Sequence, residues 1–191
     1  MAIILASKSP RRQQLLSQLG VEFTIQTAGI DETMFPDKKP EDEVARVSAA
    51  KARAIACAPD DIVISADTIV VADDTILGKP KDEADAARML RLLSGRAHTV
   101  MTGLSVRRDD AVSTTVVKTS VWFRQLTDGE IARYIATGEP MDKAGAYGIQ
   151  GGAALFCEKI VGDYYNVMGL PVCRLGQVLR KVAPEITEDI Q

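Results

Sequence analysis

The chain contains little of several residue types on which common catalytic sites depend. His98 is its only histidine, so we exclude a histidine-centred zinc site and a Ser-His-Asp triad, and we expect His98 to be structural. The cysteines Cys57, Cys157 and Cys173 are widely spaced without a paired metal-ligand pattern, and their odd number suits reduced thiols in a cytosol. We therefore assign the cysteines no chemistry.

Long apolar runs and clusters of one charge are also missing. No apolar run approaches the ~20 residues of a membrane span, and the N-terminus lacks a signal-peptide pattern, so we expect a cytoplasmic protein with no membrane partner. The 191 residues include 23 basic and 26 acidic side chains, for a net charge of -3. This balance, without a basic tail, argues against nucleic-acid binding but is compatible with a small anionic substrate.

The composition that remains is typical of a folded α/β protein. Hydrophobic residues make up 46% of the chain, enough for a sizeable core, and no repeat or linker divides it, so we expect a single domain over residues 1–191. Apolar periodicity predicts a mixed β-sheet flanked by helices. The expected strands are 2–6, 21–27 (half-buried), 61–72, 75–77, 96–106, 112–123 and 154–161. The expected helices begin at residues 10, 41, 83, 128 and 170, and residues 164–168 are expected to form a turn.

The first twenty residues predict a strand, a tight loop and a helix. Ser9 suits the N-cap and Pro10 the first helical position, so the helix dipole and free backbone N–H groups make the Ser7 to Ser9 turn a candidate anion seat. Arg11 and Arg12 then occupy the first helical turn, where the dipole favours acidic residues. They indicate a bound anion, although two solvated surface arginines would look the same.

Charged residues at apolar positions mark a second candidate region. Asp67 interrupts an apolar strand, so its carboxylate needs a cation, a proton or strong hydrogen bonds. Lys51 lies on the inward stripe of the helix 41–57, where it either extends past its neighbours to water or faces a cleft that holds negative charge. Asp31 and Glu32 follow a strand, as a divalent-cation site or an acidic surface turn would. Lys79 lies near the open end of a predicted hairpin.

The stretch from residue 142 to 152 carries four glycines and predicts a loop whose backbone approaches a ligand closely. Its spacing and context do not match a dinucleotide fingerprint, because neither a strand before it nor a helix after it is predicted. Lys143 is a candidate phosphate ligand, and Tyr147 and Gln150 are candidates to stack on or hydrogen-bond a base. A plain connecting loop is the alternative.

Three motifs together resemble the Maf family of nucleotide pyrophosphatases, in the branch that acts on dTTP and UTP. They are Ser-Lys-Ser-Pro-Arg-Arg at 7–12, Ser-Ala-Asp-Thr-Ile-Val at 65–70 and the glycine-rich run 142–151, and the match extends over nearly the whole chain. The resemblance implies a Maf or ITPase-like fold, an extended mixed sheet with two lobes and a substrate cleft between them. It also implies a Mg²⁺ or Mn²⁺ cofactor and a possible homodimer.

The residues and the resemblance together predict hydrolysis of a nucleoside triphosphate to its monophosphate and pyrophosphate, in a house-cleaning role. The resemblance makes Asp67 the proton acceptor that activates water, and we expect Glu32 and Asp67 to bind the metal. The expected catalytic residues are Asp67, Glu32, Lys51 and Lys79. The expected substrate-binding residues are Ser7, Ser9, Arg11, Arg12, Thr68, Lys143 and Gln150. A different class of function, a nucleotide-binding regulator of septum formation without turnover, is the alternative.

Three positions bear on the base. In the branch resembling 7-methylguanosine triphosphate pyrophosphatases, a Trp precedes the arginine pair, a Gln follows the catalytic Asp, and a Glu lies in the glycine-rich loop. This chain has Pro10, Thr68 and Gln150 there. A primary amide can donate to a carbonyl and accept from an imide N–H, as uracil and thymine require. We therefore predict dTTP and UTP as substrates, with a 7-methyl-GTP-type pyrophosphatase as the alternative.

Overall fold

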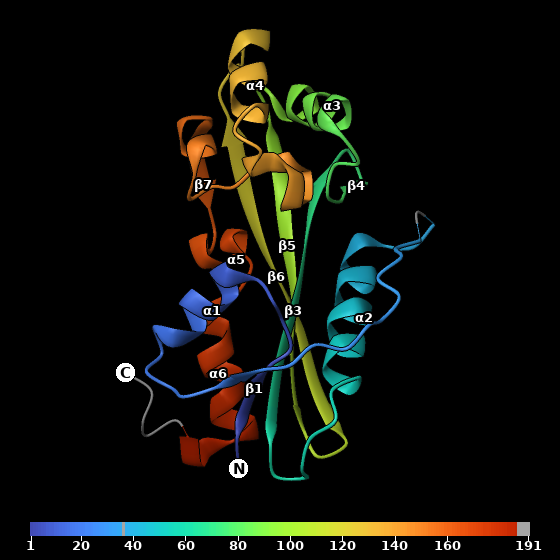
Figure 1. Ribbon diagram of the computed structural model, residues 1–191, viewed down its shortest axis with the longest axis vertical. Helices are drawn as coiled ribbons and strands as arrows, with labels where there is room; N and C mark the ends of the chain where they lie inside the picture. The colour runs from blue at the N-terminus through green and yellow to red at the C-terminus, as the bar shows by residue number, and fades with distance from the viewer. Residues whose placement is uncertain (36, 187–191) are drawn as a thin grey trace. The chain divides into compact units, whose positions relative to one another are not determined.

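The protein is seen here in a computed structural model that describes residues 1–35 and 37–186. The described residues form a seven-stranded sheet in the order β2-β1-β3-β5-β6-β7, with β4 paired to β3 (Figure 1). The strands are β1 (Ile3–Leu5), β2 (Thr24–Ile25), β3 (Ile62–Ala72), β4 (Thr75–Leu77), β5 (Ala97–Arg108), β6 (Ala111–Phe123) and β7 (Cys157–Val161). β1 runs parallel to β2 and β3, whereas β4 and β7 run antiparallel to their neighbours, so the sheet is mixed.

Helices flank this sheet, and the predicted fold class is confirmed. The helices are α1 (Pro10–Ser17), α2 (Pro40–Arg53), α3 (Glu83–Leu93), α4 (Asp128–Ile135), α5 (Tyr164–Met168) and α6 (Val172–Val182). Short 3-10 turns lie at η1 (Glu139–Asp142), η2 (Ala144–Ala146), η3 (Gly152–Leu155) and η4 (Pro184–Ile186). None of the helices in the described part of the chain has both the length and the apolar character that a membrane span requires.

The chain divides into two compact units, each assembled from separate stretches. Unit 1 comprises Met1–Asp67, Thr102–Val117 and the C-terminal stretch from Gly169, and unit 2 comprises Thr68–Met101 and Lys118–Met168. The strands β3, β5 and β6 contribute residues to both units. The expectation of one domain with two lobes stays a prediction.

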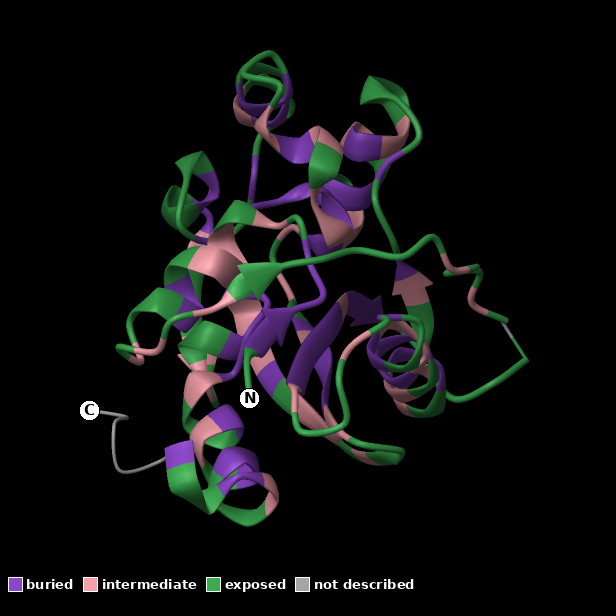
Figure 2. Ribbon diagram, turned by 60° about the horizontal axis from the view of Figure 1, so that its bottom comes forward, coloured by how far each residue is buried: buried purple, intermediate pink, exposed green. Residues whose placement is uncertain are grey.

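Unit 1 is built around β1 and the first half of β3. Every residue of β1 and of Ile62–Asp67 is buried, as expected for strands covered on both faces (Figure 2). Figure 1 shows α2 on one side of these strands and α1 and α6 on the other. The apolar stripes of these helices supply the rest of the core, including Leu15, Leu16, Val47, Leu175 and Leu179.

Unit 2 contains two capped helices, α3 and α4. Asp82 caps α3 by accepting from Asp85 N, and Thr127 and Glu130 form the predicted capping box of α4. The predicted stripes of α3 and α4 are buried, and the two helices pack against each other. The turn between β3 and β4 places Asp73 and Asp74 at positive φ, which is typical of a tight hairpin.

Three predicted elements differ from the structure, and the strand predicted over 154–161 begins only at Cys157, after the 3-10 turn η3. The prediction of a half-buried strand over 21–27 is wrong. Only the two exposed residues of β2 pair with β1, and β2 is an edge strand of the sheet. The helix predicted to reach residue 57 ends at Arg53. The segment 164–168, predicted as a turn, is the short helix α5, whose Asn166 is buried and donates to Val100 O and Thr119 Oγ1.

Candidate active site

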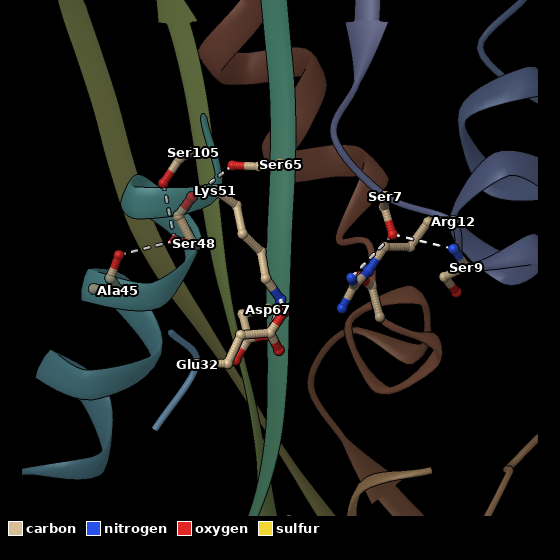
Figure 3. A network of polar contacts seen from close by, with 11 residues as sticks. Ser7, Ser9, Arg12, Glu32, Ala45, Ser48, Lys51, Ser65, Asp67 and Ser105 are labelled. Atoms are coloured by element: carbon tan, nitrogen blue, oxygen red, sulfur yellow. Dashed lines mark hydrogen bonds and ion pairs between the residues drawn. The ribbon is translucent and has the colours of Figure 1, made fainter. Parts of the chain in front are cut away.

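The start of α1 forms the first part of the candidate site. Ser9 is the N-cap and Pro10 the first helical residue, as predicted, but the Ser9 side chain makes no capping hydrogen bond. Instead the buried Ser7 Oγ accepts from Ser9 N at 3.2 Å and from Arg12 Nη1 at 3.3 Å (Figure 3). Arg12 Nε also donates to Gly169 O at 2.8 Å. Two anchors from different parts of unit 1 therefore orient the Arg12 guanidinium.

The charge of Arg12 is set in a mixed electrostatic environment. Burial lowers the pKa of Arg12 from its usual value, the carboxylate of Asp67 opposes this shift, and the neighbouring Arg11 adds to it. Glu32 also raises the Arg12 pKa. Because a guanidinium stays protonated in proteins, Arg12 is a permanent cation within electrostatic reach of both predicted metal-binding carboxylates.

Lys51 joins these two carboxylates directly. Its Nζ lies 2.6 Å from Asp67 Oδ1 and 3.1 Å from Glu32 Oε1 (Figure 3). The side chains of Lys51 and Asp67 are only 14% and 12% exposed, whereas that of Glu32 is 58% exposed. Of the alternatives left open by the sequence, Lys51 therefore faces negative charge, and a cation neutralises Asp67. The buried pair is a fixed element, and Glu32 is the partner with access to solvent.

Buried hydroxyl groups position α2 so that Lys51 reaches Asp67. Ser65 Oγ, on β3, donates to Ser48 O at 2.7 Å, and Ser48 Oγ shares a hydrogen bond with Ser105 Oγ on β5 at 2.9 Å (Figure 3). Gly103, also on β5, lies so close to α2 that an added Cβ would overlap Val44 O. The helix is thus fixed against two strands within one turn of Lys51.

Arg107 on β5 terminates α2 earlier than predicted. Its guanidinium donates to the carbonyls of Ala52 at 2.8 Å and Arg53 at 3.0 Å. It also donates to Ile55 O at 2.9 Å and contacts Cys57 Sγ. The last carbonyls of a helix have no partner within it, so a side chain that binds them stabilises the end of the helix. This contact explains why the helical pattern stops before Cys57.

Glu32 and Asp67 provide the two carboxylates from which a metal site could be built. Both have an oxygen within ion-pair distance of one ammonium, so their oxygens converge on a common position. Mg²⁺ is typically bound by one or two carboxylates together with substrate phosphates and water. Within residues 1–35 and 37–186 no group of three or more His, Cys, Asp and Glu side chains could hold a metal ion. The donor set thus fits a cation that shares its coordination with a phosphate ligand.

Unit 2 carries the remaining predicted site residues. The exposed Lys79 follows Gly78, whose carbonyl accepts from Gly145 N at 3.0 Å, so the Lys79 segment and the glycine-rich loop are adjacent. Lys143 Nζ donates to Glu139 O at 2.7 Å and to Asp142 Oδ1 at 2.6 Å. Gln150 is exposed in the turn closed by the hydrogen bond from Gly151 N to Gly148 O. Thr68 directly follows Asp67 on β3.

Tyr147 is not available to a base, so this prediction is wrong. The residue is 6% exposed, its hydroxyl is 2.8 Å from His98 Nε2, and its ring packs edge-on against Phe123. His98 is equally buried in this aromatic cluster, which confirms its structural assignment. Burial and the charge of Arg96 lower the pKa of His98 from 6.5 to about 4, so the imidazole is neutral at physiological pH.

Sequence reasoning missed Glu139 and Tyr134, which contact the glycine-rich loop. Tyr134 was assigned to a core stripe, which is correct for its ring, and Glu139 was not considered. The spacing of Gly148 and Gly151 does signal close packing, but it does not reveal the partner. That partner is the side chain of Glu139.

Comparison with known proteins agrees with the motifs. The chain matches the family model described as "Maf-like protein" over residues 2–182. It is 52% identical over 182 residues to a protein of Alkaliphilus metalliredigens (strain QYMF) named dTTP/UTP pyrophosphatase, covering 94% of this chain and 95% of that one. A protein of the same name from Geobacillus sp. (strain WCH70) is 52% identical over 181 residues, covering 94% and 97%.

Among solved structures, a nucleoside-triphosphatase / dITP/XTP pyrophosphatase from Mycobacterium abscessus aligns with a TM-score of 0.42 and 14% identity, covering 66% of this chain and 76% of that chain. This similarity is too low to support an inference. The family model, by contrast, spans nearly the whole chain and includes all three motifs. The chain therefore belongs to the Maf family.

Proposed function

We propose that this protein hydrolyses nucleoside triphosphates, preferentially dTTP and UTP, to the nucleoside monophosphate and pyrophosphate. The observation that carries the proposal is the buried Asp67 carboxylate, held by Lys51 and within electrostatic reach of Arg12. A carboxylate among cations is what water activation beside a phosphate requires. Relatives about half identical over most of both chains are named dTTP/UTP pyrophosphatase, which supports the same substrates here.

In the proposed reaction, the oxygen of a water molecule forms a bond to phosphorus and the bond between the α and β phosphates breaks. Pyrophosphate leaves with the electron pair of that bond, and the proton of the water passes to Asp67. Lys51 holds the Asp67 carboxylate in place through its 2.6 Å contact. Asp67 is therefore assigned as the general base, and Lys51 as its positioning partner and a neighbouring cation.

The substrate phosphates are assigned to the cations and to the start of α1. Arg11 and Arg12 provide guanidinium groups, and the N-terminus of the helix provides backbone N–H groups beside Ser7 and Ser9. In unit 2, Lys79 and Lys143 are assigned to phosphate as well. An ammonium carries three N–H groups, so the two hydrogen bonds of Lys143 do not exhaust its donors.

Mg²⁺ or Mn²⁺ is the proposed cofactor, held by Glu32 and Asp67 and by phosphate oxygens. Such an ion supplies positive charge that stabilises the negative charge developing on the phosphates. Glu32 is the more exposed of the two carboxylates and lies at the longer distance from Lys51, so it can exchange the ammonium for a metal at lower cost.

Base selection is assigned to Gln150 and to Thr68, which follows Asp67 in the sequence. The exposed Gln150 amide can donate to a pyrimidine carbonyl and accept from the imide N–H of thymine or uracil. A carboxylate at the same position would suit the donor edge of a guanine. The proposal therefore excludes 7-methyl-GTP as the preferred substrate.

The proposal is tested by incubating the protein with UTP or dTTP and Mg²⁺ and identifying the products by ion-exchange chromatography and ³¹P NMR. We expect UMP or dTMP together with pyrophosphate. Formation of UDP and orthophosphate would contradict cleavage between the α and β phosphates. UTP binding without turnover in the presence of Mg²⁺ or Mn²⁺ would instead favour a nucleotide-binding regulator.

A further inference from the structure

Glu139, at the start of η1, contacts both ends of the glycine-rich loop of unit 2. Its backbone carbonyl accepts from Lys143 Nζ at 2.7 Å, near the start of the loop. Its Oε2 accepts from Gly152 N at 3.0 Å, at the end of the loop. Its Oε1 accepts from Tyr134 Oη at 2.9 Å, on α4. One residue thus joins both ends of the loop to the helix before it.

Tyr134 extends this connection to the middle of the loop. Its hydroxyl accepts from Gly148 N at 3.0 Å and donates its single proton to Glu139 Oε1. Because a hydroxyl has one proton, the direction of this chain of hydrogen bonds is fixed by the carboxylate, which can only accept. Burial raises the pKa of Tyr134, and the hydrogen bond to Glu139 raises it further, so the hydroxyl remains a donor at physiological pH.

Two glycines of the loop, Gly148 and Gly151, leave room for this carboxylate. A Cβ at Gly151 would overlap Glu139 Oε1, and a Cβ at Gly148 would lie 2.9 Å from the same oxygen and 2.7 Å from Lys143 Cε. The sequence predicted that these glycines allow the backbone to approach a ligand. In the structure the backbone at both positions approaches Glu139, whose carboxylate leaves no room for a Cβ there.

Gln150 lies between the two tethered glycines. Gly148 and Gly151 close its turn with a hydrogen bond of 3.0 Å, and both pack against Glu139. The Gln150 side chain itself is exposed. The backbone on either side therefore sets the direction in which the Gln150 side chain leaves the loop, and that backbone is held by Glu139 and Tyr134.

We propose that Glu139, acting through Tyr134 and the backbone N–H groups of Gly148 and Gly152, is a positioning residue that fixes Gln150 and so determines how strictly the enzyme selects its base. This inference rests on the proposed function, because it concerns base selection by Gln150. Neither Glu139 nor Tyr134 is assigned a contact with the substrate. Their effect is on the ratio of activities toward different bases.

The test compares Glu139→Gln with Glu130→Gln, a matched control on the neighbouring helix. Glu130 also accepts backbone and side-chain hydrogen bonds, and its partners Thr127 and Arg124 lie outside the loop. A glutamine at 139 retains the shape of the side chain and loses one of its two acceptor atoms. We expect kcat/KM for dTTP relative to dCTP to fall about tenfold in Glu139→Gln and to change less than twofold in Glu130→Gln.

Amide hydrogen exchange at Gly148 and Gly152 provides a second measurement that needs no turnover. We expect both amides to exchange faster in Glu139→Gln than in Glu130→Gln at equal global stability. If Glu139→Gln does not fold, Tyr134→Phe retains the ring and removes the hydroxyl that joins Gly148 to Glu139, and the same two results are expected for it.

The inference and the proposed function can fail separately. Unchanged base selectivity in Glu139→Gln, in an enzyme whose wild type does prefer dTTP, overturns the inference and leaves the proposed function intact. A wild type without turnover overturns the proposed function, and exchange at Gly148 and Gly152 then decides whether Glu139 holds the loop. Unchanged exchange at Gly148 and Gly152 in Glu139→Gln would show that Glu139 does not hold the loop.

Discussion

The regions around Asp67 and around Glu139 each have a carboxylate at the centre, but the partners of the two carboxylates differ. Asp67 is held by the charged side chain of Lys51, with a second, exposed carboxylate on the same ammonium. Glu139 is held by a tyrosine hydroxyl and a backbone N–H. Ion pairs can be exchanged for a metal or a phosphate, whereas backbone hydrogen bonds fix a shape. The first region is suited to chemistry and the second to recognition.

The largest effect is expected from Asp67→Asn, which removes the proposed general base and keeps the size of the side chain. We expect kcat to fall by roughly 10²- to 10⁴-fold while nucleotide affinity stays within about tenfold, because the cations remain. Asp61→Asn is the matched control, since Asp61, in the same unit, accepts hydrogen bonds from the backbone N–H groups of Ala2 and Ala58. Steady-state kinetics and nucleotide titration separate the two quantities.

If both variants lose activity equally, Asp67 has no special chemical role. A loss of affinity in Asp67→Asn that matches its loss of kcat would move Asp67 from catalysis to binding. Either result would remove the contrast between the two carboxylate regions.

A second prediction concerns His98, which packs beside the glycine-rich loop through Tyr147. Its pKa is about 4 in the folded protein and near 6.5 when unfolded. Between these values the unfolded chain binds a proton that the folded chain does not, so the free energy of unfolding falls as the pH is lowered from 6.5 to 4. The expected loss is about 3 kcal/mol.

Urea unfolding at several pH values measures this loss, and His98→Gln should remove most of it. Because His98 is the only histidine, its imidazole gives a single NMR titration from which the pKa can be read directly. A titration near pH 6.5 in the folded protein would show that the aromatic cluster does not exclude the charged form.

The third prediction is Gln150→Glu, which exchanges the exposed amide for a carboxylate. A buried polar group left unpaired costs about 1 to 3 kcal/mol, so the preference for dTTP and UTP over purine triphosphates should weaken roughly 10- to 100-fold. A panel of dTTP, UTP, CTP, GTP and 7-methyl-GTP ranked by kcat/KM measures it. Thermal unfolding of the variant should match the wild type, since Gln150 is exposed. GTP or its methylated form leading in the wild type would refute the base assignment.

The smallest effect is expected from Ser48→Ala. The substitution removes the hydrogen bond to Ser105 Oγ that holds α2 against β5 and should lower the free energy of unfolding by about 1 kcal/mol. Because α2 carries Lys51, loosening this helix should displace the Lys51 ammonium from Asp67. We expect kcat to fall by a few-fold and base selectivity to stay unchanged. A change in selectivity as large as that in kcat would mean that the two regions do not act separately. Denaturant melts and the nucleotide panel measure both effects.

The sequence predicted those features that depend on local pattern and on the cost of burying charge. Asp67 had to have a partner because an unpaired buried carboxylate is unfavourable, and Lys51 lay on the inward face of a helix, so their pairing follows from two independent arguments. The helix starts at Pro10, Glu83 and Asp128 were also predicted, because the start of a helix depends on a few adjacent residues.

Contacts between distant residues were not predictable in the same way. The end of α2 depends on Arg107, which lies on β5, far from α2 in the sequence. The burial predicted for residues 21–27 was not found, because β2 is an edge strand. The contacts of Glu139 were missed partly because Oε2 accepts from glycine backbone, which carries no side-chain signal in a sequence. A single sequence therefore indicated where chemistry lies more readily than what holds it in place.

The contact of Arg107 with the end of α2 has a consequence for Lys51, which lies in the last turn of that helix. The carbonyls at a helix C-terminus attract cations, and a long lysine side chain can fold back toward them. Arg107 already donates to the carbonyls of Ala52, Arg53 and Ile55. It thereby occupies carbonyls at the end of the helix that could otherwise attract the Lys51 ammonium, whose partners in the structure are Asp67 and Glu32.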